Sequence, residues 1–138
     1  MFNRLAMAFG ASTHTPINIF VLEDDLERHE WFEKKFSRDH VDIATDVPHA
    51  IRLLERNIYD MIYLDHDLLP EHYGAPELPT DRCGHNVAMW LAEHPEKQRN
   101  ARIIVHTRNA EGAFRMVELL RATGRSAEYI PFPILSQR

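Results

Sequence analysis

Short apolar stretches alternate with amphipathic segments along the chain. The apolar stretches are rich in β-branched and aromatic residues and have the length of buried strands. They predict five strands, at residues 17–22, 41–45, 61–64, 102–106 and 127–130. The segments between them predict helices over residues 26–36, from Asp46 through Leu54, over 85–94 and over 111–124.

Strands that alternate with helices form βαβ units, whose strands run parallel and whose helices cover both faces of the sheet. The predicted fold class is therefore α/β, a doubly wound five-stranded parallel sheet. The stretch from Leu68 to Gly84 is longer than usual for a connection in such a fold, which favours a functional loop. We divide the chain into an N-terminal extension (1–16), one domain (17–135) and a C-terminal tail (136–138).

Composition narrows the classes of protein that fit. Cys83 is the single cysteine, which excludes an intramolecular disulfide and a multi-cysteine zinc site. No stretch approaches the ~20 apolar residues of a membrane span, so we expect a cytoplasmic protein with no membrane partner. The net charge of −5 argues against a general nucleic-acid coat protein, and no extended nucleic-acid surface is evident.

Charge is distributed unevenly along the chain. Residues 1–96 carry 8 basic and 18 acidic residues, whereas residues 97–138 carry 8 basic and 3 acidic residues. An acidic half facing a basic half suits a site that holds a metal on one side and a phosphate on the other. Ordinary solvated faces of opposite charge would give the same balance.

Three of the predicted strands end in polar or ionisable residues, and such ends lie at one edge of a parallel sheet, where ligands bind. The three segments are Glu23-Asp24-Asp25, Asp65-His66-Asp67 and His106-Thr107-Arg108-Asn109. Each has an ordinary alternative, because Asp and Asn commonly cap helices; Asp25 in particular suits the N-cap of the helix that follows it. Their joint occurrence indicates a binding or catalytic site.

Crowded carboxylates need a cation or a proton to neutralise them, and oxygen ligands favour Mg²⁺ or Mn²⁺. A nearby histidine shifts that preference toward Mn²⁺ or another transition metal. The predicted metal ligands are Asp24, Asp25, Asp65 and Asp67, with Glu23 as a further acid at the same place.

Several polar residues at the same edge suit a bound phosphate. We expect Thr107, Arg108 and Asn109 to contact it after the fourth strand. His85 would join them from the start of its helix, where backbone N–H groups favour anions, or would be a surface residue.

Asp24 or Asp25, Asp65 and Thr107 resemble the site of response-regulator receiver domains. The resemblance implies a flavodoxin-like receiver architecture, in which the first acids bind Mg²⁺ and the aspartate after the third strand accepts a phosphoryl group. The receiver lysine after the fifth strand has no counterpart, because no lysine follows Lys97. The chain also ends before a fifth receiver helix, so the predicted architecture lacks the last helix.

A narrower resemblance rests on three motifs. Leu64–Leu68 reads LDHDL, Gly84 precedes a helix, and His106-Thr107-Arg108-Asn109 is followed by Gly112 and Met116. These segments are similar to the cyclic-phosphate processing receiver domains over roughly residues 17–135. The resemblance implies that the protein processes cyclic phosphates.

Two histidines supply a physical basis for that reaction. Opening a cyclic phosphodiester requires an activated water and a protonated leaving oxygen, and histidine suits both tasks because its ordinary pKa is near 6.5. The predicted catalytic residues are His66, His106 and Asp65. The alternative for both histidines is a metal ligand or a hydrogen-bonded structural residue.

The favoured hypothesis is a metal-dependent phosphoesterase acting on cyclic phosphates of nucleotides or RNA ends, and a homodimer is one assembly that we consider for it. The main alternative is a non-enzymatic receiver-like signalling module, switched by phosphorylation of Asp65 or by ligand binding. A third hypothesis is a scaffold or inhibitor that uses only the surface of the fold.

Overall fold

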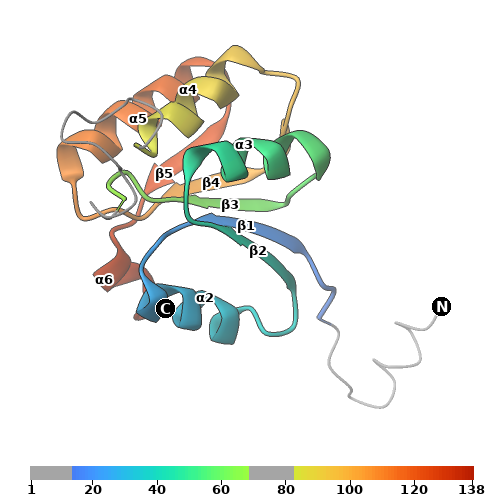
Figure 1. Cartoon of the computed structure of the whole chain (residues 1–138). Helices are drawn as coiled ribbons and strands as arrows, with labels where there is room; N and C mark the ends of the chain where they lie inside the picture. Colours follow the sequence, from blue (N-terminus) through green and yellow to red (C-terminus); the bar gives the residue numbers. More distant parts are fainter. Residues whose placement is uncertain (1–13, 69–82) are drawn as a thin grey trace.

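The computed structural model describes residues 14–68 and 83–138. These residues form one parallel sheet with strand order β2-β1-β3-β4-β5, covered by helices on both faces (Figure 1). The strands are β1 (Asn18–Leu22), β2 (His40–Ala44), β3 (Met61–Leu64), β4 (Arg102–Val105) and β5 (Ser126–Tyr129). The helices are α2 (Leu26–Lys35), α3 (Val47–Arg56), α4 (His85–Glu93), α5 (Ala110–Ala122) and α6 (Phe132–Leu135).

The predicted doubly wound α/β fold is confirmed. In Figure 1, α3, α4 and α5 lie on one face of the sheet, and α2 and α6 lie on the other. Most of the predicted N-terminal extension and of the loop between Leu68 and Gly84 falls outside the described residues. After β5 the chain forms the four-residue helix α6.

The alternation of side chains along each strand divides the core into two clusters. Phe20 and Leu22 of β1 pack with α3, α4 and α5, whereas Ile19 and Val21 pack with Phe32 of α2. The same alternation in β3 and β4 decides on which side of the sheet each residue beyond the strand end emerges.

Local signals set the helix ends as the sequence indicates. The Asp25 side chain accepts hydrogen bonds from the backbone N–H groups of Glu27 and Arg28, so the capping interpretation of this residue is confirmed. Asp46 likewise caps α3 by accepting from the N–H of His49. Gly124 follows α5 with φ of 84°, a left-handed conformation that glycine adopts readily.

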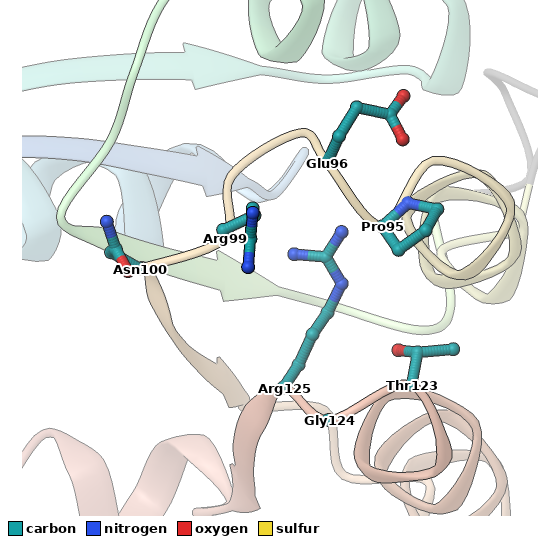
Figure 2. Close-up of a pocket in the computed structure, with 7 residues that line it drawn as sticks. All are labelled: Pro95, Glu96, Arg99, Asn100, Thr123, Gly124 and Arg125. Atoms are coloured by element: carbon teal, nitrogen blue, oxygen red, sulfur yellow. The ribbon is translucent and has the colours of Figure 1, made fainter.

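At the amino-terminal edge of the sheet, Arg125 is buried and holds the α4–β4 connection. Its guanidinium donates to the backbone carbonyls of Leu91, His94, Lys97 and Gln98. Arg125 lines a pocket of about 540 Å³ at this edge, and Figure 2 shows its side chain among the other lining residues. No predicted site residue lines the pocket.

None of the described helices combines the length and apolar character needed to cross a membrane.

Candidate functional site

The pairing of three strands brings three polar residues together. Leu22 of β1, Leu64 of β3 and Val105 of β4 lie side by side in register, so the residues that follow them lie level at the carboxyl edge. These residues are Glu23, Asp65 and His106. One potential ligand atom from each lies within 4.8 Å of the others, and all three side chains are buried.

Glu23 is the centre of this cluster, which we call the carboxylate cluster (Glu23, Asp65 and His106). One carboxylate oxygen accepts hydrogen bonds from the backbone N–H groups of Asp24 and Asp25, each at 3.1 Å. The other oxygen lies 2.8 Å from Nε2 of His106. Burial raises the pKa of Glu23, but the bond and charge of His106 outweigh it and leave the pKa lowered.

Asp65 carries the least stabilised charge of the cluster. Burial and the neighbouring Glu23 charge raise the pKa of Asp65 to about 6, although His106 and Thr107 act against the rise. One carboxylate oxygen accepts from the backbone N–H of His66 at 2.8 Å. A cation bound at the cluster would restore the charged form, because it removes the repulsion from Glu23.

His106 lies deeper than a solvent-facing acid or base would. The side chain is 0% exposed and packs against the rings of Phe32, Tyr63 and Phe132. Its Nδ1 atom has no hydrogen-bond partner among the described residues. This position favours the alternative role of His106, as a metal ligand or a residue that positions Glu23.

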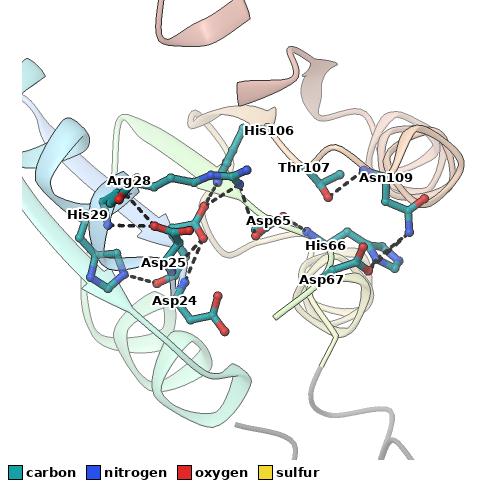
Figure 3. Close-up of polar contacts among 12 residues, drawn as sticks. Asp24, Asp25, Arg28, His29, Asp65, His66, Asp67, His106, Thr107 and Asn109 are labelled. Carbon is teal, nitrogen blue, oxygen red and sulfur yellow. Dashed lines mark hydrogen bonds and ion pairs between the residues drawn. The ribbon is translucent and has the colours of Figure 1, made fainter. Parts of the chain in front are cut away.

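His66 emerges on the opposite side of the sheet, toward α5, and forms a second group with its own partners. Nδ1 of His66 lies 2.5 Å from Oδ1 of Asp67 (Figure 3). Nε2 of the same ring lies 3.4 Å from the sulfur of Cys83. The contacts with Cys83 and Asp67 raise the pKa of His66 to about 9 against the effect of burial. The two predicted catalytic histidines therefore follow adjacent strands but have separate partners.

Two glycines allow the backbone and α5 to approach the end of β3 closely. A Cβ atom on Gly84 would lie 1.7 Å from the carbonyl oxygen of Asp65. A Cβ atom on Gly112 would lie 2.6 Å from the ring of His66. Gly84 and Gly112 of the sequence motifs are thus required by the packing around Asp65 and His66.

The residues after β4 differ in their surroundings. Thr107 is buried, and its hydroxyl accepts from the backbone N–H of Asn109 at 3.1 Å. Asn109 caps α5, and its amide nitrogen lies 3.4 Å from both His66 and Asp67. Arg108 is exposed, and within the described residues no hydrogen bond or ion pair holds its guanidinium.

His85 is the first residue of α4, and its ring centroid lies 6.5 Å from that of His66. Burial and the nearby charges of His66 and Arg115 lower the pKa of His85. Both histidines line a pocket of about 340 Å³. Its lining residues are His66, Cys83, His85, Asn86, Met89 and Arg115.

The four predicted metal ligands do not converge on one point. Asp65 belongs to the carboxylate cluster, and Asp24 is buried next to Glu23 in sequence. Asp25 is occupied as the cap of α2, and Asp67 has a 59% exposed side chain bonded to His66. Glu23, which the sequence indicated only as an auxiliary acid, belongs to the carboxylate cluster with Asp65 and His106, whereas Asp25 and Asp67 do not.

Arg28 and Cys83 are two neighbours of the site that sequence patterns did not indicate. Arg28 reaches the carboxylate cluster from α2 (Figure 3), and Cys83 contacts His66 from the start of the α4 segment. Arg28 is one of several charged residues on its helix, and Cys83 is an isolated cysteine, so neither carried a distinguishing pattern.

The chemistry of the carboxylate cluster fits a divalent cation. Two buried carboxylates and one imidazole offer oxygen and nitrogen ligands within 4.8 Å of one another, and Nε2 of His106 faces Glu23 at 2.8 Å. Mg²⁺ prefers oxygen ligands, whereas Mn²⁺ also accepts imidazole nitrogen.

Comparison with known proteins gives a match over most of the domain. Residues 17–122 match the model of a family described as the cyclic-phosphate processing receiver domain. No curated protein matches the sequence.

Solved structures of receiver domains share the fold. A CheY-like response regulator receiver domain from Methanospirillum hungatei JF-1 has 17% identity and a TM-score of 0.63, with 89% of this chain and 86% of that chain covered. The receiver domain of a sensor histidine kinase from Pseudomonas aeruginosa PAO1 has 24% identity and a TM-score of 0.62, with 89% and 90% covered; it has a magnesium ion in its active-site cleft.

A response regulator from Burkholderia pseudomallei also superposes on the chain. The identity is 20% and the TM-score is 0.61, with 85% of this chain and 60% of that chain covered. That structure contains a phosphorylated aspartic acid, a calcium ion and citrate.

Proposed function

The chain belongs to the cyclic-phosphate processing receiver domains, and on this premise we propose that it is a metal-dependent phosphoesterase acting on cyclic phosphates of nucleotides or RNA ends. The observation that carries the proposal is the hydrogen-bonded pair of His66 and Asp67 beside the buried carboxylate cluster. A receiver that only stores a phosphoryl group on an aspartate has no need of an acid–base histidine.

The carboxylate cluster is the proposed metal site, with Asp24 as an adjacent acid. A bound Mg²⁺ or Mn²⁺ would supply positive charge to the phosphate oxygens. Glu23 is held by the N–H groups of Asp24 and Asp25, so its carboxylate is fixed before any ligand arrives. His106 keeps the second oxygen of Glu23 in place.

His66 is the proposed general acid. Its contacts with Asp67 and Cys83 favour the protonated ring, which can donate a proton at neutral pH. Water attacks phosphorus and gives its proton to the Asp65 carboxylate. As the bond between phosphorus and one ring oxygen breaks, His66 protonates that oxygen, and the product is a phosphomonoester.

The remaining predicted contacts belong to the phosphate and the rest of the substrate. Thr107 is buried beside Asp65 and would hold a phosphate oxygen. Asn109 and His85 lie next to His66 and would contact the substrate from α5 and α4. Arg108 is exposed, so its proposed contact is with a more distant part of the ligand.

The test is hydrolysis of 2′,3′-cyclic nucleotides with Mg²⁺ or Mn²⁺. We expect His66→Gln to lower kcat by about 10²–10⁴-fold, the usual contribution of a general acid. His40→Gln is the control, because His40 is exposed and begins β2 at the opposite edge. Equal turnover by the wild type and the His66 variant would reject the proposal.

The second candidate function is a signalling module switched by phosphorylation of Asp65. It is favoured by the raised pKa of a buried aspartate beside Thr107 and by the receiver fold. Incubation with a small phosphodonor and Mg²⁺ would then add the mass of a phosphoryl group to Asp65 and promote a homodimer. No mass gain would exclude this function.

A further inference from the structure

We propose that Arg28 is the phosphate-contacting cation of this site, and that it competes with a divalent metal for the carboxylate cluster. The inference rests on the proposed function only in taking the cluster as the place where phosphate binds. Arg28 would be a positioning and binding residue supplied by α2 rather than by a strand end.

The geometry directs Arg28 onto the cluster. Its Nη1 atom lies 3.3 Å from Oε1 of Glu23 and 3.9 Å from Oδ2 of Asp65. The side chain is 17% exposed, so it lies between the buried carboxylates and solvent. In Figure 3 the side chain of Arg28 extends from α2 toward His106 and Asp65.

Two features of the fold hold Arg28 in this position. Its backbone N–H donates to the capping side chain of Asp25, which fixes the first turn of α2. Its guanidinium carbon lies 4.7 Å from the centroid of the Phe132 ring, a cation–π contact. The backbone N–H of Phe132 in turn donates to the carbonyl of His106 at 2.9 Å, which ties this ring to the end of β4.

Charge explains why the site needs such a residue. Glu23, Asp24 and Asp65 would repel a phosphate, and a single metal ion must neutralise them before it can attract an anion. The segments that follow β4 and β5 do not supply such a cation. Arg108, after β4, is exposed, and the residue after β5 is the apolar Ile130. Arg28 is the arginine that faces both carboxylates of the cluster.

The contacts of Arg28 suit a cation that can change partners. Distances of 3.3 and 3.9 Å are long for a charge-assisted hydrogen bond, so the present pairing with the carboxylates is weak. A guanidinium carries five N–H donors in a planar fork that matches phosphate oxygens. Arg28 therefore partly neutralises Glu23 and Asp65 and has donors left for a phosphate.

Because of these two roles, substitution of Arg28 should change the metal affinity and the phosphate affinity in opposite directions. Removal of the guanidinium removes a competing positive charge, so the affinity of the cluster for a metal should rise. The same change removes a phosphate contact, so the affinity for phosphate should fall. A purely structural arginine would weaken both affinities, or neither.

The experiment compares Arg28→Gln with Lys34→Gln, which removes one positive charge from an exposed position on the same helix. Calorimetry first measures Mn²⁺ binding, and then inorganic phosphate binding at saturating Mn²⁺. We expect Arg28→Gln to bind Mn²⁺ about 3- to 10-fold more tightly and phosphate about 10-fold more weakly, the change that one lost charged contact produces. Arg28→Lys should give an intermediate phosphate affinity, and Lys34→Gln should match the wild type.

Several outcomes would overturn the inference. One is a folded Arg28→Gln protein whose two affinities both match the wild type, and another is a parallel loss of both. A wild type that binds no phosphate at saturating Mn²⁺ would overturn it as well. Thermal unfolding without ligand shows whether Arg28→Gln is folded.

The proposed function has a separate readout. A wild type that binds phosphate through Arg28 yet hydrolyses no cyclic nucleotide would reject the phosphoesterase and keep the role of Arg28. If the protein hydrolyses cyclic nucleotides and Arg28→Gln leaves its phosphate affinity unchanged, the phosphoesterase is kept and the role of Arg28 is rejected.

Discussion

The proton on His66 depends on two neighbours that differ in exposure and in charge. Cys83 has the larger effect on the pKa of His66, and Asp67 adds to it from an exposed position. Because Oδ1 of Asp67 binds Nδ1, this sequence neighbour sets the orientation of the His66 ring. The contacts that favour the protonated ring of His66 therefore come from residues outside the carboxylate cluster.

Cys83→Ser should therefore lower the pKa of His66 from about 9 toward its ordinary value. NMR titration of the His66 ring protons measures this change, and the pH above which activity falls should move down with it. His40, which is exposed at the opposite edge of the sheet, serves as an internal reference in the same spectra. An unchanged His66 titration would show that the sulfur has no part in holding the proton.

Asp65 makes the stability of the metal-free protein depend on pH. Its pKa is raised to about 6 in the folded chain from 3.8, so the folded state binds the proton more tightly than the unfolded state. Stability should consequently be highest below pH 4 for this group and fall as the pH rises through 6. We expect Asp65→Asn to raise the free energy of unfolding at pH 7 by about 1–3 kcal/mol.

Urea denaturation of both proteins at pH 4 and pH 7 measures this effect. The gain from Asp65→Asn should shrink at pH 4, where the wild-type carboxyl is protonated. Added Mn²⁺ should stabilise the wild type more than the variant. A variant less stable than the wild type at pH 7 without metal would contradict the raised pKa.

At the scale of the elements, the parity of each strand decides which residues meet. Glu23, Asp65 and His106 continue the alternation of Val21, Tyr63 and Ile104, which all face α2. His66 follows the other parity and faces α5. The separation of the two histidines is therefore a consequence of their strand positions, one and two residues beyond the strand ends.

The close approach of α4 and α5 to the end of β3 depends on glycine at two positions, Gly84 and Gly112. Gly84→Ala should destabilise the fold by about 2–4 kcal/mol, because its Cβ would meet the rigid backbone of Asp65 at 1.7 Å. Gly124→Ala is the matched control: its φ of 84° carries a conformational cost of about 1 kcal/mol, but no atom lies within 4 Å of the added Cβ. Thermal unfolding of the two variants checks the difference, and equal losses would contradict the close packing at Gly84.

At the scale of the whole molecule, sequence patterns predict the layers and the site edge well. The alternation of β-rich and helical segments is sufficient for the sheet, and the polar strand ends correctly indicate its carboxyl edge. The exact set of metal ligands is harder to predict from sequence. An aspartate such as Asp25 suits both a helix cap and a metal site, and only the structure shows that it caps α2. Strand parity would have indicated Glu23, whereas Arg28 reaches the cluster through a side chain whose direction no pattern encodes.

The position of the carboxylate cluster also has a consequence for the order of folding. Its members come from three strands, β1, β3 and β4, and they meet only when all three are paired in register. A nascent chain still lacking β4 contains Glu23 and Asp65 but not His106, so the proposed ligand set is incomplete. A metal ion that binds the complete cluster would stabilise the state in which β4 has paired with β3. It would therefore favour the correct register of the three central strands.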